Sequence, residues 1–209
     1  KVERSYQHVD PGLIGNKGRL VVSELGGRAN TAIRAGQLGH QLEGLDPREL
    51  SKVIKQMAAD GLAFEGAEAS FELLIRRRTE GYAAPFRIVD FTVLVEQREG
   101  RELLAEATVK VEVEGEVLHT AADGNGPVNA LDAALRKALR AFYPQLDGVH
   151  LVDYKVRILD GNAATAARTR VVIDSADGER TWSTMGSDTN IIAASAAARA
   201  DSRVYVLWK

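Results

Sequence analysis

A glycine-rich loop that leads into a predicted helix is the clearest candidate for binding chemistry in this sequence. It reads Gly124-Asn125-Gly126-Pro127. Glycine allows positive φ angles and a close approach of a ligand, and the free N–H groups of a first helical turn attract anions such as a small carboxylate. The same residues would equally serve a tight strand-to-helix turn, so the spacing alone leaves a binding site and a simple turn both open.

The other candidate groups favour structural roles over catalysis. Arg76-Arg77-Arg78 ends a predicted helix, where positive charge complements the helix dipole. Asp90 and Asp153 occupy equivalent positions of an internal repeat, which favours a shared structural role over acid–base chemistry. No P-loop, G-x-S-x-G or H-E-x-x-H motif occurs. The histidines lack metal-ligand spacing, so we expect them on the surface and assign no catalytic or metal-binding residue: His8, His40, His119 and His150.

Composition narrows the class of protein. The 209 residues contain 27 Lys plus Arg, 29 Asp plus Glu and no Cys, and they allow one large or two small domains. A formal charge of −2 gives no electrostatic reason to expect nucleic acid or an anionic membrane as a partner. No apolar run approaches the ~20 residues of a membrane span, and the first residues lack a signal-peptide pattern. We therefore expect a soluble cytoplasmic protein, and the missing initiator Met suggests a piece of a longer one.

The N-terminal half is predicted to contain two small subdomains. Residues 1–45 read as a linker subdomain with a short strand at Leu20-Val21-Val22 and a short helix around Ala29–Leu38. Residues 46–82 read as a helical subdomain. Its first helix starts at Asp46-Pro47, and its second covers about Ala67–Arg77. The first helix has one apolar stripe, formed by Leu50, Val53, Ile54, Met57 and Ala58, and Gly61 is its expected C-cap.

Residues 83–209 alternate between strand and helix patterns. Apolar residues recur at period two over Ile88–Val95 and Thr108–Val113, which predicts half-buried antiparallel strands, and a third strand is expected near Glu116–Ala121. The helix that follows Pro127 buries one apolar face and ends before Pro144. Its predicted core residues are Val128, Leu131, Leu135, Ala138, Leu139 and Phe142.

This strand–helix unit is repeated. Ile88-Val89-Asp90-Phe91 matches Leu151-Val152-Asp153-Tyr154, which begins 63 residues later, and the same offset extends through Val109/Val172 and Gly115/Gly178. A two-residue contraction then aligns Asn129 with Asn190. We predict an α+β fold of duplicated βββα units, about 86–145 and 149–203, related by a pseudo-twofold axis. The last apolar stretch, Val204–Trp208, is expected to form a terminal strand or a docking tail.

Several stretches together resemble one enzyme family. Gly124–Ala130, Leu151–Tyr154 and Asn190–Ser195 resemble the regulatory domain of the alpha-isopropylmalate synthase and citramalate synthase family. Tyr6–Pro11, Val22–Asn30 and Gly66–Phe71 are similar to the linker subdomains that precede that domain. Ala-Phe-Tyr-Pro at 141–144 and Leu-Val-Asp-Tyr-Lys-Val-Arg at 151–157 look more like the citramalate synthase branch.

The resemblance implies a full-length enzyme that condenses acetyl-CoA with a 2-oxo acid at a divalent metal in a (β/α)8 barrel. The barrel and its metal ligands would lie upstream of Lys1, so no cofactor and no activity are expected of this chain alone. The resemblance therefore implies that this chain corresponds to the part of the enzyme that senses an amino acid. In the resembling domains an end-product amino acid, isoleucine or leucine, binds near a homodimer interface and inhibits the enzyme by feedback.

Carried over by position, the resemblance implies an effector pocket between the glycine loop and the first strand of the second repeat. Tyr154 and Ile158 share one face of that strand and can both wall an apolar pocket. The side-chain oxygen of Asn129 could bind the effector's ammonium group. Without the resemblance, Leu151, Tyr154 and Ile158 would be read as core residues. The implied set is Gly124, Asn125, Gly126, Pro127, Val128, Asn129, Leu151, Tyr154 and Ile158, with Ala164, Thr165 and Asp188 as weaker candidates.

Two other functions stay open at this point. The region could be a purely structural dimerisation domain whose glycine loop is only a turn. It could also turn over acyl-CoA itself, which a thiol-release assay would detect.

Overall fold

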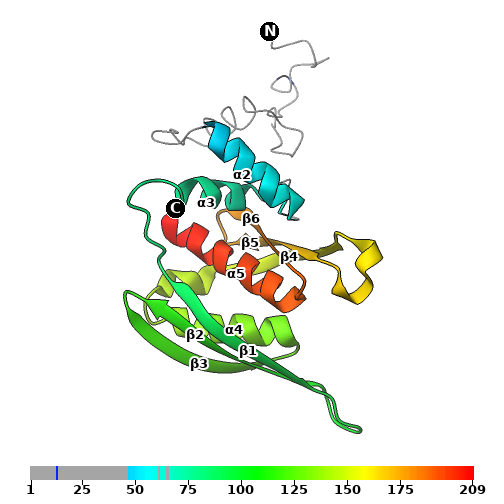
Figure 1. The fold of residues 1–209 in the computed structure, drawn as a ribbon. Coiled ribbons are helices and arrows are strands. Elements are labelled where there is room, and N and C mark those ends of the chain that lie inside the picture. Colours follow the sequence, from blue (N-terminus) through cyan, green and yellow to red (C-terminus); the bar gives the residue numbers. More distant parts are fainter. Residues whose placement is uncertain (1–12, 14–46, 61, 65) are drawn as a thin grey trace.

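Two three-stranded antiparallel sheets, each followed by a helix, form the main body of the described structure, and a further pair of helices lies beside the second sheet (Figure 1). This computed structural model describes residues 13, 47–60, 62–64 and 66–209. The predicted linker subdomain, its strand and helix, and the caps Asp46 and Gly61 lie outside the described residues. None of the helices described here is both long and apolar enough to cross a membrane.

The helical pair consists of α2 (Pro47–Ala59) and α3 (Glu68–Arg76), in agreement with the prediction. The apolar stripe of α2 buries Leu50 and Ile54 against α3, because residues three and four apart share one helix face. The same cluster includes Met185 of the second sheet, and the partly buried Val172 of that sheet packs against the cluster. The pair therefore covers one face of that sheet.

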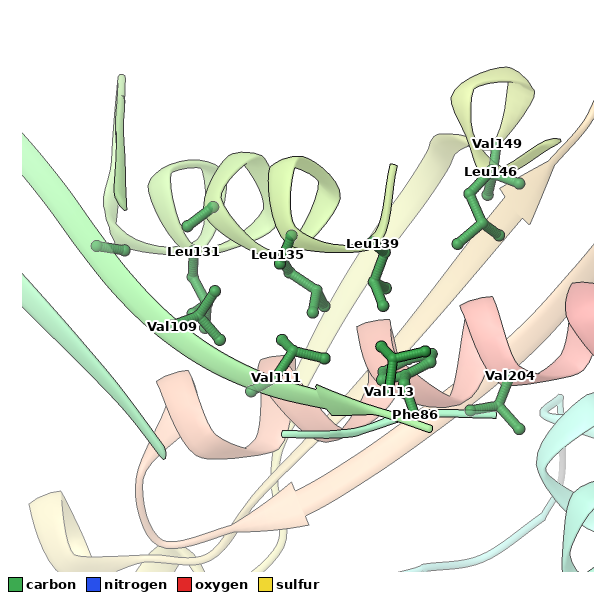
Figure 2. Packing of buried hydrophobic residues seen from close by; sticks show 14 of the residues in the cluster. Phe86, Val109, Val111, Val113, Leu131, Leu135, Leu139, Leu146, Val149 and Val204 are labelled. Carbon is green, nitrogen blue, oxygen red and sulfur yellow. The ribbon is translucent and has the colours of Figure 1, made fainter. Parts of the chain in front are cut away.

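The first repeat contains β1 (Arg87–Glu96), β2 (Leu104–Val113), β3 (Glu116–Gly124) and α4 (Pro127–Leu139). The period-two pattern is confirmed, since every second side chain of the central strand β2 is buried. These side chains lie under the apolar face of α4, which the sequence also predicted (Figure 2). The facing residues are Val109, Val111 and Val113 on β2 and Leu131, Leu135 and Leu139 on α4.

The second repeat begins with a 3-10 turn, η2 (Pro144–Gly148), and β4 (His150–Ile158). A second 3-10 segment, η3 (Gly161–Ala166), joins β4 to β5 (Thr169–Ala176) and β6 (Thr181–Asp188), and α5 (Ile191–Trp208) ends the chain. Because α5 packs on the sheet face opposite the helical pair, β5 and β6 are covered on both sides, whereas the edge strand β4 stays mostly exposed (Figure 1). The predicted α+β fold of duplicated βββα units is confirmed.

The register of the repeat differs from the prediction. Phe91 pairs with Val109 and Tyr154 pairs with Ile173, so the offset is 63 for the first strands but 64 for the second strands. The predicted match of Val109 with Val172 is therefore wrong. Val171, Val172 and Ile173 are all β-branched, so the sequence does not indicate which of them faces the core, and a one-residue slip exchanges the two faces.

The helices follow the offset of 64 as well. Thr120 donates a hydrogen bond to the Ala134 carbonyl and Thr184 donates one to the Ala198 carbonyl, both at 2.8 Å. The N-cap of α5, Asn190, is thus equivalent to the N-cap of α4, Gly126, and the predicted pairing with Asn129 is wrong.

The last apolar stretch is also different from the prediction. Val204–Trp208 forms the final turns of α5 rather than a strand or a separate tail. Val204 is buried in the core, while Tyr205 and Trp208 pack edge-to-face, and the Tyr205 hydroxyl donates a hydrogen bond to Glu72 of α3. A run of five apolar residues fits a helix that is buried on two sides as well as a strand, so the run alone could not decide.

Candidate functional site

A pocket of about 420 Å³ opens between the start of α4, the start of β4 and one arginine of α5. It therefore lies where a helix of the first repeat meets a strand of the second. The structure brings together seven residues of the predicted set, which are Asn125, Gly126, Pro127, Val128, Asn129, Leu151 and Tyr154.

The glycine loop ends in a helix start that no side chain caps. Gly126 is the N-cap of α4 with extended φ and ψ angles of −178° and 169°. Pro127 has no N–H, so the N–H groups of Val128 and Asn129 remain without partners inside the helix. In α5, by contrast, the side chain of Asn190 accepts the equivalent N–H groups. The start of α4 thus keeps backbone donors that α5 has already satisfied.

Gly124 packs against the first turn of α4 and does not line the pocket. A Cβ at this position would lie 2.4 Å from the Ala130 nitrogen and 2.6 Å from Asn129 Oδ1. That oxygen accepts a hydrogen bond from the N–H of Asn125 at 3.2 Å. An amide oxygen has two lone pairs, so Asn129 retains one acceptor position for a ligand.

A β-bulge in β4 turns Leu151 toward the pocket. Leu151 and Tyr154 are three residues apart and would point to opposite faces of a regular strand. A register shift at Val152 inserts one extra residue, so Leu151 pairs with Ser175 while Tyr154 pairs with Ile173. Both side chains consequently lie on the same face. The equivalent bulge in β1 is one of the clearest traces of the duplication.

Tyr154 is held in place by a short chain of hydroxyl hydrogen bonds. Its Oη lies 2.6 Å from Ser195 Oγ, and Ser195 Oγ lies 2.6 Å from the Ile191 carbonyl oxygen, which can only accept. Because Ser195 donates to that carbonyl, the Tyr154 hydroxyl donates to Ser195. The half-buried ring is thereby fixed as one wall of the pocket.

A charged cluster forms the inner side of the pocket. Asp132 Oδ1 accepts hydrogen bonds from Arg199 Nε at 2.7 Å and from Arg203 Nη2 at 2.5 Å. Arg136 Nη2 lies 3.7 Å from the other carboxylate oxygen. The side chains of Arg199 and Arg203 are only 5% and 2% exposed. Three guanidinium groups therefore surround a single carboxylate.

The pKa values in this cluster are set by burial and by the presence of three positive groups around one negative group. Burial alone would raise the pKa of Asp132, but the charges of Arg203 and Arg199 outweigh it and hold that pKa below the ordinary 3.8. Burial lowers the pKa of Arg203 to about 10. Among the described residues, Arg199 Nη1 is a buried donor without a hydrogen-bond partner.

The remaining predicted site residues lie at the other end of β4. Ile158 pairs with Thr169, which in turn pairs with Asp188. Ala164 and Thr165 belong to η3, which directly follows β4. This end is about 20 Å from Leu151 along the strand. A role of these residues in ligand binding stays a prediction.

Two interpretations that were made from the sequence can be compared directly with the structure. Leu151 and Ile158 are 42% and 60% exposed, so the alternative that they are core residues is wrong for these two. Tyr154, by contrast, is partly buried and packs against a core cluster of β5 and α5. Asp90 and Asp153 each follow a bulge and form ion pairs with Lys110 and Lys155, in keeping with a structural role.

Four residues that line the pocket were not singled out from the sequence, namely Asp132, Arg136, His150 and Arg199. One signal was present for the arginines. Arg199 and Arg203 are four residues apart in an alanine-rich stretch, so they share one face of the helix predicted there. Cationic side chains on a buried helix face require partners, and this indicates a charged cluster.

Sequence comparison identifies the domain. The family model described as the LeuA allosteric (dimerisation) domain matches residues 65–207, which include both repeats and the pocket. The chain belongs to this family. The resemblance seen in the sequence is thus confirmed, and the pocket is a feature of a LeuA domain.

Relatives of the whole chain carry enzyme names. The chain is 47% identical over 208 residues to (R)-citramalate synthase of Geobacter sulfurreducens, covering 98% of this chain and 39% of that protein. It is 45% identical over 213 residues to (R)-citramalate synthase of Aquifex aeolicus, covering 100% and 40%. Identity to 2-isopropylmalate synthase of Aquifex aeolicus is 30% over 202 residues, covering 95% and 36%. The chain spans about two fifths of the length of these relatives.

The divalent metal that the resemblance implies for a whole enzyme does not fit the described residues. Residues 47–60, 62–64 and 66–209 contain no group of three or more His, Asp or Glu side chains placed to hold a metal ion. His119 and His150, the two histidines in these ranges, are both exposed.

Proposed function

We propose that this chain is the regulatory region of a citramalate synthase and that it binds the end-product amino acid, isoleucine in preference to leucine, in the α4–β4 pocket. The complete enzyme would condense acetyl-CoA with pyruvate in branched-chain amino-acid biosynthesis in the cytoplasm. The observation that carries the proposal is the meeting of the glycine loop and the bulged start of β4 around one pocket of about 420 Å³.

The lining suits a small zwitterion with an apolar side chain. Val128, Leu151 and the ring of Tyr154 offer apolar surface, while the free N–H groups of α4 and the oxygen of Asn129 offer polar contacts. A few convergent polar groups in an apolar pocket are typical of small-molecule sites. Isoleucine and leucine differ only in branching, and a hydrophobic pocket separates even ligands that differ by a whole methylene by only about 1–3 kcal/mol, so we expect a modest preference.

A route for feedback runs from the sheet to the helical pair. The N–H of Met185 in β6 donates a hydrogen bond to Ser70 Oγ in α3 at 2.9 Å. Arg77, just after α3, forms an ion pair with Asp201 of α5. A ligand that changes the packing of the two repeats would therefore move the helical pair that leads toward the preceding part of the enzyme. Feedback typically needs only about 1–3 kcal/mol of coupling between sites.

The active unit in this proposal is a homodimer. The edge strands β1 and β4 expose apolar side chains that a second copy would cover, among them Leu94, Val95, Val156 and Ile158. The same strands also expose Val89, Leu151 and Val152 at the end where the pocket lies, so an effector bound there would lie close to this part of the surface. Dimer formation and effector binding are then linked.

Calorimetric titration of the chain with isoleucine, leucine and valine tests the proposal. We expect heat and a rise in melting temperature with isoleucine, and smaller effects with the other two. The alternative is a structural dimerisation domain without an effector. Absence of heat and of any thermal shift with all three amino acids would establish that alternative and refute the sensor.

A further inference from the structure

Arg199 lines the pocket with a guanidinium group whose hydrogen-bonding capacity is not fully used in the described structure. The residue is 4% exposed, lines the pocket, and directs Nε and Nη2 to Asp132, yet its Nη1 is buried without a hydrogen-bond partner. An unpaired buried cationic donor is costly, because it has lost its hydration and gained nothing in return. A negatively charged ligand in the pocket would remove that cost.

The charge balance of the cluster favours an anion as well. Asp132 is the only carboxylate within ion-pair distance of Arg136, Arg199 and Arg203 among the described residues. Arg136 also donates hydrogen bonds to the carbonyl oxygens of Leu146 and Val149, and Arg203 donates one to the Arg199 carbonyl. The cluster as a whole thus carries an excess of positive charge, and Arg199 is its member with a buried donor that has no partner.

The duplication supplies an internal comparison. A pocket of about 580 Å³ lies between β1 and α5, at the position that the pseudo-twofold relates to the α4–β4 pocket. In it Arg77 and Asp201 neutralise each other in a two-pronged ion pair. The positions of this pocket that are equivalent to polar residues of the α4–β4 pocket carry apolar side chains. Ala193 stands where the α4–β4 pocket has Asn129, Ala196 where it has Asp132, Ala200 where it has Arg136, and Phe91 where it has Tyr154.

We infer that the guanidinium group of Arg199 binds the carboxylate of the amino-acid effector and that each chain therefore binds one effector, in the α4–β4 pocket only. The inference rests on the proposed function. The N–H groups at the start of α4 are the competing carboxylate donors. Both kinds of donor would make charge-assisted hydrogen bonds to a carboxylate, but only Arg199 adds a full positive charge, so Arg199 is the stronger partner.

The first test leaves the protein unchanged and alters the ligand. The chain is titrated calorimetrically with L-isoleucine and with L-isoleucinamide, which keeps the ammonium group and the side chain but has no carboxylate. We expect one isoleucine per chain, and at least about tenfold weaker binding of the amide. Equal affinities, or two isoleucines per chain, would overturn the inference while leaving the sensor function intact. No binding of isoleucine at all would overturn both.

The second test distinguishes binding of the carboxylate by Arg199 from binding by the N–H groups at the start of α4. Arg199→Gln should weaken isoleucine binding by about 10- to 100-fold and should make the variant nearly indifferent to the exchange of isoleucine for its amide. Arg199→Lys should restore part of the affinity. Arg140→Gln is the matched control, because Arg140 pairs with Asp147 at the exposed end of α4 away from the pocket. If Arg199→Gln is folded and still distinguishes isoleucine from the amide as the unchanged chain does, the α4 N–H groups hold the carboxylate and the inference is wrong.

Discussion

Asp132 is the residue whose replacement should most affect the packing of the two repeats. It lies on α4, and two buried arginines of α5 point their guanidinium groups at one of its oxygens. Asp132→Asn keeps the size of the side chain and removes its charge. Arg199 and Arg203 would then be buried close together without a counter-charge, and loss of one partner from a buried ion pair typically costs about 3–5 kcal/mol.

The measurement is the free energy of unfolding from urea titration, with the melting temperature as a second readout. A loss of about 3–5 kcal/mol corresponds to about 6–20 °C for a domain of this size. Asp90→Asn is the matched control, because Asp90 makes the same kind of pair with Lys110 at the surface, where both side chains are about half exposed. The control should change stability by at most about 1 kcal/mol.

A second substitution checks the cause. If the loss in Asp132→Asn comes from uncompensated positive charge, then adding Arg199→Met should recover part of it, since an apolar group of similar length carries no desolvation cost. A loss below about 1 kcal/mol in Asp132→Asn, equal to that of Asp90→Asn, would refute the reasoning. So would a double variant that is less stable than Asp132→Asn alone.

Three further predictions concern single contacts. Gly124→Ala should destabilise the chain by about 1–3 kcal/mol in urea unfolding, because its Cβ would overlap the backbone of α4, whereas Gly148→Ala meets no atom within 4 Å and should be nearly neutral. Ser70→Ala leaves the buried N–H of Met185 without its acceptor, and should cost about 1–3 kcal/mol and increase hydrogen exchange of that amide. The lowered pKa of Asp132 means that its contribution to stability is complete above about pH 4 and is lost as pH falls through the folded-state pKa; unfolding measured from pH 6 to pH 2 should therefore depend less on pH in Asp132→Asn.

Much of the fold could be predicted because each element carries its own local signal. The alternation of β2 and the apolar stripes of α2 and α4 reflect how side chains alternate in a strand and recur in a helix, so both could be recognised without tertiary information. Register could not. Three successive β-branched residues, 171–173, satisfy either face of β5, and only the pairing with β4 decides which one is buried.

The candidate site also has some features that the sequence indicated and others that it could not. The glycine loop and the start of β4 were recognisable as a pair from the sequence, through their residue types and the family resemblance. The sequence could not indicate that a bulge turns Leu151 to the side of Tyr154, because a bulge is defined by two strands together. It also could not indicate which charges meet in the pocket.

By itself, then, the sequence determined the element types, the duplication and the family, since these depend on local periodicity and on motifs that are contiguous in the chain. The tertiary structure alone decided the offset of 64, the continuous helix through Trp208 and the meeting of Asp132 with Arg199 and Arg203. These features depend on contacts between residues that are far apart in the chain. Charge and burial act over a few ångströms in space, and separation along the sequence does not reveal which groups come that close.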